Sequence, residues 1–232
     1  MDFDHVALGA ADADAARDWS ADVFGAAPPD TGRLEARQAD DAPWGPLDVI
    51  TLAAAMPHGR LEILAPAETT TKASTEPSTE APPAPLRIWP SLCAEKRPRP
   101  IAWALRTTDL DATRDQAAWE TAPPVTLRRG GEIWRVAAPR DQAEAGPAMP
   151  LLVARVGPTG AALLRPLGAL GRPMALGALR VKHPDPEHVE SLLRSVDAAG
   201  AAARSGFELT VRRDGSPSLE AAFRPLRLAR RL

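Results

Sequence analysis

The sequence predicts an α+β protein built from a repeated unit of one strand, one helix and then two or three antiparallel strands. Three observations lead to this expectation. A segment near the N-terminus recurs later in the chain, an aspartate begins each predicted helix, and turn residues separate the short apolar segments that follow. With 232 residues, of which 44% are hydrophobic, the chain is long enough to bury a sizeable core and too apolar to be disordered throughout.

The repeat joins a short apolar strand to the start of a helix. Residues 4–18 recur as residues 101–115, with Asp, Asp, Ala, Arg and Asp at the same offsets after the strand. Residues 178–189 form a third, weaker copy. Because a strand precedes the helix start in every copy, we interpret the repeat as a structural one.

Each predicted helix has a start signal. Asp12, Asp109 and Asp185 suit the N-cap position, since a carboxylate accepts hydrogen bonds from the free amides of the first turn. Pro186 fits the first helical position, and Gly25 is a suitable stop for the first helix. The third helix has an apolar face with helical spacing, formed by Val189, Leu192, Leu193 and Val196.

After each helix, two short apolar segments flank a turn, and we expect them to pair as an antiparallel hairpin. The three predicted hairpins are residues 48–52 and 60–64 around Pro57-His58-Gly59, residues 125–127 and 133–136 around Gly130-Gly131, and residues 207–211 and 219–223 around Asp214-Gly215. The turn residues supply the backbone conformations that tight connections need.

These signals divide the chain into four parts. We expect a first unit over residues 1–66, a linker or loop over 67–100, a second unit over 101–160, and a partial third unit over 161–232 packed on the same domain. Residues 65–85 are rich in Thr, Ser, Glu, Pro and Ala without apolar periodicity, which predicts a mobile loop. A lid over a site is the alternative for this segment.

Charge and composition exclude several functions. The 28 basic and 30 acidic residues give a net charge of -2, which argues against nucleic-acid binding by bulk electrostatics. The single cysteine, Cys93, allows no intrachain disulfide and no multi-cysteine zinc site. The most apolar long stretch, residues 161–181, is interrupted by arginines and prolines, so no membrane span is expected. No signal peptide is seen either, and a cytoplasmic protein is the default expectation.

Several motifs lie at the starts and ends of these repeats. Asp4-His5-Val6 opens the first strand, Leu61-Glu62 lies on the last strand of the first unit, and residues 103–112 open the second unit. In this order they resemble the vicinal oxygen chelate (glyoxalase/bleomycin resistance/dioxygenase) superfamily, and more narrowly its glyoxalase-like domain family, over about residues 3–225. The resemblance implies paired βαβββ units that form a curved mixed sheet around a cleft, with the partial third unit at the C-terminus.

The resemblance also implies where a metal would bind. Metal-using relatives take one ligand from the first strand and a Glu from the fourth strand of each unit. The first unit keeps both, as His5 and Glu62, whereas Ala102 stands at the His5 position of the second unit and residues 151–156 contain no carboxylate. We therefore expect His5 and Glu62 to form a weak divalent metal site, for which zinc, nickel, iron and manganese are candidates.

Two classes of function stay open. One is an enzyme in which Glu62 is the catalytic carboxylate and Arg106 contacts an anionic part of the substrate. The other is a non-catalytic protein that sequesters a small oxygen-rich molecule at a degenerate metal site. A core histidine is the alternative for His5, and a salt bridge at the rim is the alternative for Arg106. A homodimer that joins two first units would add a second His5 and a second Glu62 to the site.

Overall fold

The computed structural model of the protein describes residues 1–25, 31–37, 47–51, 60–66, 97–129, 132–140, 146–157 and 174–225. The first unit contains β1 (Asp2–Gly9), α1 (Ala13–Phe24), β2 (Thr31–Arg37), β3 (Leu47–Thr51) and β4 (Arg60–Pro66). The second contains β5 (Arg99–Arg106), α2 (Leu110–Gln116), β6 (Val125–Arg129), β7 (Glu132–Ala137) and β8 (Leu151–Val156), with the 3-10 turn η4 (Gly146–Ala148) before β8. The third part contains β9 (Met174–His183), α4 (Pro186–Arg194), α5 (Ala198–Arg204), β10 (Glu208–Arg213) and β11 (Ser218–Pro225).

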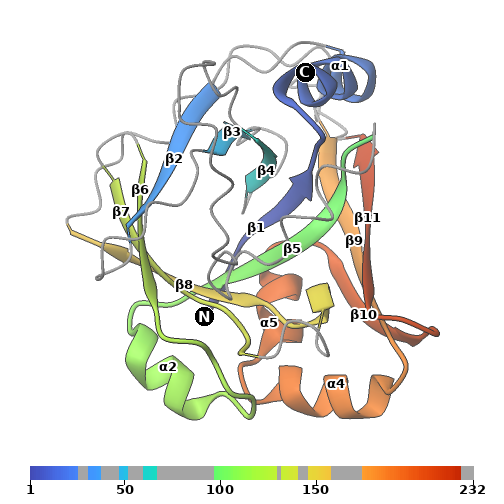
Figure 1. The fold of residues 1–232 in the computed structure, drawn as a ribbon. Coiled ribbons are helices and arrows are strands. Elements are labelled where there is room, and N and C mark those ends of the chain that lie inside the picture. Colours follow the sequence, from blue (N-terminus) through green and yellow to red (C-terminus); the bar gives the residue numbers. More distant parts are fainter. Residues whose placement is uncertain are drawn as a thin grey trace, which may run out of the picture.

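The strands of the two units form one curved mixed sheet, as predicted, and this sheet closes into a barrel in the order β1-β4-β3-β2-β6-β7-β8-β5 (Figure 1). The same pairing occurs twice: β1 is parallel to β4, and β5 is parallel to β8. Two antiparallel contacts join the units, β1 with β5 and β2 with β6. The pairing pattern is therefore that of two units related by an approximate twofold axis, which passes close to the Val6–Trp103 pair of β1 and β5.

This symmetry identifies the equivalent positions of the two units residue by residue. Glu62 lies opposite Ala7 in the β1–β4 ladder, and Leu151 lies opposite Ala104 in the β5–β8 ladder. Because Ala7 and Ala104 are equivalent in the repeat, Leu151 occupies the place of Glu62. Ala102 occupies the place of His5 by the same alignment.

The predicted helix starts are confirmed. The side chain of Asp12 accepts a hydrogen bond from the Ala15 amide at 2.6 Å, and Asp109 and Asp185 do the same three residues into α2 and α4. Gly25 ends α1 in the left-handed region, at φ 75°, where a residue with a Cβ would be strained. Local sequence thus determines where these three helices begin.

The two faces of the barrel sheet have different surroundings. On the outer face, one large core packs the barrel against the helices and against a second sheet, formed by β10, β9 and β11. This core includes Trp103, Leu61, Ile63, Leu152, Leu179, Val181, Val189 and Leu193. On the inner face, smaller clusters contain barrel residues alone, among them Ala7, Ala102, Ala104, Leu151 and Val153. Strand alternation therefore assigns residues to the core or to the barrel interior.

The predicted hairpin between residues 207–211 and 219–223 is wrong. Both segments are strands, but β9 lies between them, parallel to β10 and antiparallel to β11. The helices α4 and α5 carry the chain from β9 to its parallel neighbour β10, and β11 then pairs with the opposite edge of β9 rather than with β10. Asp214 and Gly215 lie in the connection that passes the end of β9, where the Asp214 amide donates to the His183 carbonyl at 3.1 Å.

Other expectations have mixed outcomes. The hairpin partners β3–β4 and β6–β7 do pair antiparallel, whereas the turns between them lie outside the described residues. Ala65 and Pro66 belong to β4, so the predicted mobile loop does not begin at residue 65, and its remainder also lies outside the described part. The strand β2 and the helix α5 were not predicted. None of the helices that the structure describes is long and apolar enough to cross a membrane.

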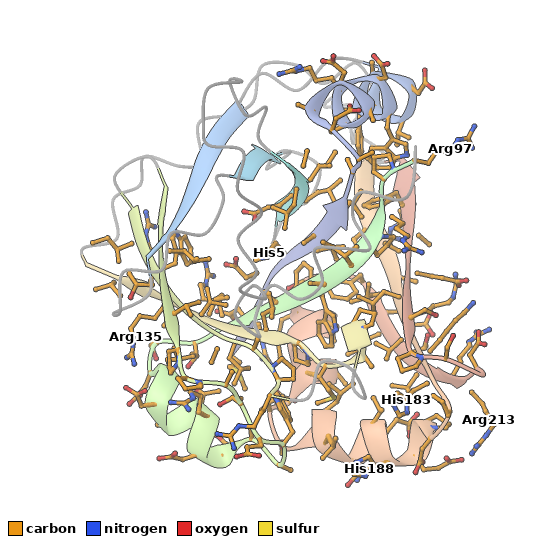
Figure 2. All side chains as sticks on the ribbon, in the orientation of Figure 1. His5, Arg97, Arg135, His183, His188 and Arg213 are labelled. Carbon is orange, nitrogen blue, oxygen red and sulfur yellow. The ribbon has the colours of Figure 1, made fainter. Side chains whose placement is uncertain are left out.

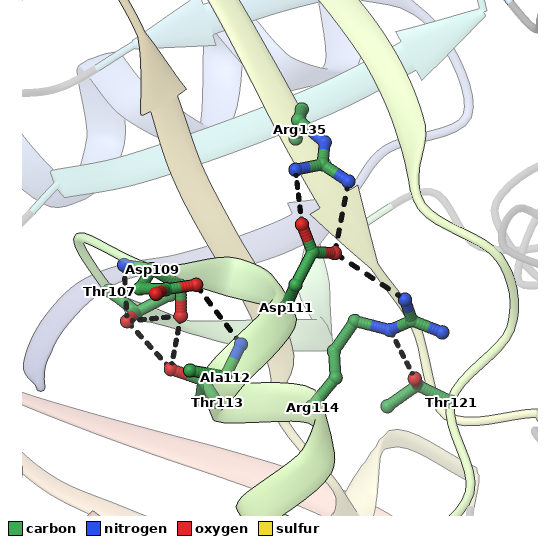
Figure 3. A network of polar contacts seen from close by, with 8 residues as sticks. All are labelled: Thr107, Asp109, Asp111, Ala112, Thr113, Arg114, Thr121 and Arg135. Atoms are coloured by element: carbon green, nitrogen blue, oxygen red, sulfur yellow. Dashed lines mark hydrogen bonds and ion pairs between the residues drawn. The ribbon is translucent and has the colours of Figure 1, made fainter.

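A polar network attaches α2 to the outer face of β7. Arg135 projects from β7 (Figure 2) and donates two hydrogen bonds to the Asp111 carboxylate, at 3.0 and 3.1 Å (Figure 3). Arg114 lies 3.7 Å from the same carboxylate and donates to Thr121 at 2.8 Å. The hydrogen bonds from Arg135 hold the pKa of Asp111 below its ordinary value, with Arg114 adding to the effect.

We predict that Asp111→Asn lowers the melting temperature at neutral pH and leaves it unchanged in strong acid. A carboxyl whose pKa is lower in the folded state stabilises the fold above its ordinary value of 3.8, and this contribution is lost as the pH falls through the folded pKa. The gap between wild type and variant should therefore narrow as the pH falls below 3.8 and close in strong acid, as measured by thermal unfolding followed by circular dichroism. Asp115→Asn, at an exposed position of the same helix, is the control and should show no such gap.

Candidate functional site

His5 lies on β1 with its side chain toward the barrel interior and 12% exposed (Figure 2). Its Nδ1 atom is 2.9 Å from Oδ2 of Asp4, whose side chain is only 3% exposed. Consecutive residues of a regular strand point to opposite faces. Here the register between β1 and β5 shifts between Phe3 and His5, and an irregularity of this kind re-aims a side chain, which allows Asp4 and His5 to meet.

Glu62 reaches the same place from β4. Leu61 and Ile63 are fully buried in the outer core, so alternation directs Glu62 to the inner face with His5 and Ala7. Its Oε2 atom lies 3.9 Å from Nε2 of His5, and its side chain is 13% exposed. The structure therefore brings together the two residues that the sequence predicted as metal ligands; their role stays a prediction.

Arg106 lies at the end of β5, at the rim of the same cluster. Its guanidinium is 3.9 Å from Oδ1 of Asp4 and 3.7 Å from Oδ2 of Asp2, and its side chain is half exposed. The rim salt bridge that was the alternative reading is thus present. Both distances exceed a normal hydrogen bond, so the five N–H donors of the guanidinium are not all engaged by these contacts.

Asp4 is the residue of this site that the sequence reasoning missed. In the sequence it stands out only as the first residue of the Asp4-His5-Val6 motif. A signal was available, because a carboxylate next to His5 within a strand flanked by Phe3 and Val6 needs a partner if it is buried. Regular alternation would have placed Asp4 and His5 on opposite faces, and the register shift that unites them has no marker in the sequence.

The second unit offers an apolar surface where the first offers polar groups. Ala102 and Leu151 occupy the places of His5 and Glu62, and Val136 and Val153 extend this surface along β7 and β8. Further along the same two strands, the Arg155 guanidinium on β8 lies 5.6 Å from the centre of the Trp134 ring on β7, which is a cation–π arrangement.

The donor set for a resident metal is incomplete in the part of the chain that the structure describes. His5 and Glu62 supply two donors, while Asp4 is engaged on the opposite nitrogen of the imidazole. No group of three or more metal-ligating side chains is found among the described residues. Catalytic zinc sites typically have three protein ligands, so the described residues supply one fewer than such a site uses.

Both outer strands of the first unit are paired within the chain, and the homodimer that joins two first units stays a prediction. The outer strands of the first unit, β1 and β2, are already hydrogen-bonded to β5 and β6 of the same chain.

The remaining described histidines lie away from this site. His188 is exposed on α4, and His183 lies at the end of β9 with its Nδ1 close to the backbone of Asp185 (Figure 2). His58 and Cys93 lie outside the described residues.

Comparison with known proteins places this architecture among related folds. A family model described as "Glyoxalase-like domain" matches residues 3–196. A crystal structure of a hypothetical protein from Staphylococcus aureus has a TM-score of 0.53 at 12% identity, covering 93% of this chain and 87% of that one. Methylmalonyl-CoA epimerase from Mycobacterium tuberculosis aligns over 66% of this chain and 86% of its own, with 21% identity and a TM-score of 0.38. The sequence matches none of the curated proteins with which it was compared.

We predict that the protein, purified without added metal, contains clearly less than one divalent ion per chain. Two donors hold an ion weakly, and the symmetry-related positions are Ala102 and Leu151. Elemental analysis by mass spectrometry measures this directly, with Glu62→Gln as the matched sample. One ion per chain in the wild type that is absent from Glu62→Gln would contradict the prediction and would show that other residues complete the set.

Proposed function

Because the chain belongs to the glyoxalase-like domain family, we propose that it binds a small molecule with adjacent oxygen atoms at the cluster of Asp4, His5 and Glu62 inside the barrel. One observation supports this most directly. Nε2 of His5 and Oε2 of Glu62 face each other at 3.9 Å, from adjacent parallel strands. Two polar atoms at this separation suit two neighbouring oxygens of one ligand better than a single group.

The surroundings give each residue of the cluster a different part in the proposal. Glu62 is the proton acceptor, because its carboxylate is largely buried on the inner face, opposite Ala7 and close to the imidazole of His5. Arg106, half exposed at the rim, offers its remaining N–H donors to a ligand oxygen. A zinc, nickel, iron or manganese ion held by His5 and Glu62 stays a prediction, which the metal analysis above tests.

The proposed binding can be tested with two isomeric diols. Catechol carries its hydroxyls on adjacent carbons and resorcinol does not, so titration calorimetry should show heat for catechol and much weaker binding for resorcinol. Glu62→Gln should weaken catechol binding about 10-fold or more, since a hydrogen bond to a charged group contributes roughly 1.5–3 kcal/mol. Glu208→Gln, at an exposed position on β10, is the matched control and should bind as the wild type does. Equal affinity for both diols would refute the adjacent-oxygen proposal.

Catalysis and simple binding give different outcomes with hydroxyacetone in deuterated water. If Glu62 removes a proton from the carbon beside the carbonyl, solvent deuterium replaces that proton, and the CH₂ signal in the ¹H NMR spectrum decays. We expect this exchange with the wild-type protein, and a loss of about 100-fold or more in Glu62→Gln, as is typical when a general base is removed. Normal catechol binding without any exchange would instead favour the non-catalytic, sequestering function.

A further inference from the structure

We propose that two copies of the chain pair through the free edges of their β10 strands, antiparallel and centred on Thr210, so that two three-stranded sheets join into one continuous sheet. This pairing does not depend on the function proposed above, because no residue of the Asp4, His5 and Glu62 cluster takes part in it. It also differs from a dimer that joins two first units, since β10 belongs to the third part of the chain.

The strand β10 lies at an edge of its sheet. Among the strands that the structure describes, it pairs only with β9, whereas β11, at the opposite edge, lies against β5 and η4. An edge strand presents a row of backbone N–H and C=O groups that no neighbouring strand satisfies. A strand from a second molecule can bind these groups, so the β10 edge is where this sheet can be extended.

One face of β10 is committed to its own chain. Leu209 and Val211 are partly buried and pack against the large core, on the side of α4 and α5. Arg213 lies beside α4 (Figure 2), where its guanidinium donates to the Glu187 carboxylate at 2.8 Å and to the Pro184 carbonyl at 2.7 Å. The side chains of this face are therefore held within the molecule.

The opposite face carries the charges that select a register. Alternation places Glu208, Thr210 and Arg212 there, and the two charged residues are exposed. When two such strands pair about a twofold axis at Thr210, Glu208 of each copy lies opposite Arg212 of the other. Two opposite-charge pairs then form at once, and cross-strand pairs of this kind stabilise antiparallel strands. On the core face, the same register sets Leu209 opposite Val211.

The neighbouring registers are less favourable. Centring on Val211 sets Glu208 opposite Asp214, and centring on Arg212 sets the two Arg212 guanidiniums against each other. Like charges directly opposite each other on adjacent strands are destabilising. Centring on Leu209 leaves Arg212 beyond the paired part of the strands. The charge pattern of β10 is thus complementary to a second copy of itself about Thr210.

An unsatisfied hydroxyl lies at the centre of this register. The Oγ1 atom of Thr210 is buried and has no hydrogen-bond partner in the part of the chain that the structure describes. A buried hydroxyl without a partner costs free energy, and hydrogen bonds between facing threonines are among the contacts that stabilise paired strands. In the pair centred on Thr210, the two hydroxyls belong to residues directly opposite each other, so one can donate and the other accept. This observation does not involve the charges and indicates the same centre.

Sedimentation of the full chain in the analytical ultracentrifuge tests the pairing. One short strand buries less surface than a standard stable interface of about 1,600 Å², so we expect the dimer to dissociate on dilution in the micromolar range. The weight-average mass should rise from 24.6 kDa, the mass of one chain, toward twice that value between about 1 and 300 μM. A chain that stays monomeric over this range would overturn the proposal.

Charge reversal tests the register. Glu208→Arg and Arg212→Glu should each raise the dissociation constant of the dimer about 10-fold or more, because both symmetry-related pairs become like-charged at once. The double variant that combines them has opposite charges facing each other again and should associate as the wild type does. Asp115→Arg, the same change of charge at an exposed position of α2, is the control and should leave association unchanged. Association that neither reversal weakens, or that the double variant does not recover, would overturn the register.

A disulfide tests the centre of the pair without relying on charge. In a chain whose single cysteine is removed by Cys93→Ser, Thr210→Cys should give a covalent dimer on mild oxidation, as seen by non-reducing electrophoresis. Arg212→Cys in the same background is the matched control. In this register the two copies of residue 212 are offset by about 13 Å along the strands, whereas a disulfide requires Cα atoms within roughly 7 Å. No covalent dimer from Thr210→Cys, or an equal yield from both variants, would overturn the pairing about Thr210.

Discussion

The antiparallel pairing of β1 with β5 is the contact on which the rest of the molecule depends. It sets the two repeats against each other about the Val6–Trp103 pair, so that the sheet of one unit continues into that of the other and closes. The outward face of these two strands then carries Val6, Leu8, Trp103 and Leu105, all essentially inaccessible to solvent, into the core shared with the three-stranded sheet. The inward face carries His5. One strand pair thus supplies both the hydrophobic contact that joins the parts and the platform of the candidate site.

The symmetry of the scaffold contrasts with the asymmetry of its chemistry. Backbone pairing is the same in both units, whereas His5 and Glu62 have Ala102 and Leu151 as their counterparts. A symmetric four-donor set would bind an ion between the units. The present arrangement instead places two polar groups opposite an apolar surface, which suits a ligand that is polar at one end only. The fold accommodates either arrangement, because the inward side chains do not contribute to the outer core.

Much of the fold could be predicted because its signals are local. Asp12, Asp109 and Asp185 cap helices through contacts three residues away, and the alternation around Glu62 is visible in its two apolar neighbours. What could not be predicted depends on partners distant in sequence. The position of β9 between β10 and β11 depends on strand pairing with a segment about thirty residues earlier, and a turn motif at Asp214-Gly215 is equally compatible with a hairpin. For the site, residue identity indicated His5 and Glu62, whereas Asp4 required knowledge of the register.

The shift of register between Phe3 and His5 also bears on how such a site can be gained or lost. In an unbroken strand, Asp4 and His5 would point to opposite faces whatever their identities, so no exchange of side chains at these positions could make them neighbours on one face. The length of the chain at this point is what matters. Removal of one residue before Asp4 would restore regular alternation and separate the two groups while leaving both in the sequence, and the addition of one residue elsewhere in β1 or β5 could unite a different pair. The first strand is therefore a place where insertions and deletions, rather than replacements, change the chemistry of the barrel interior.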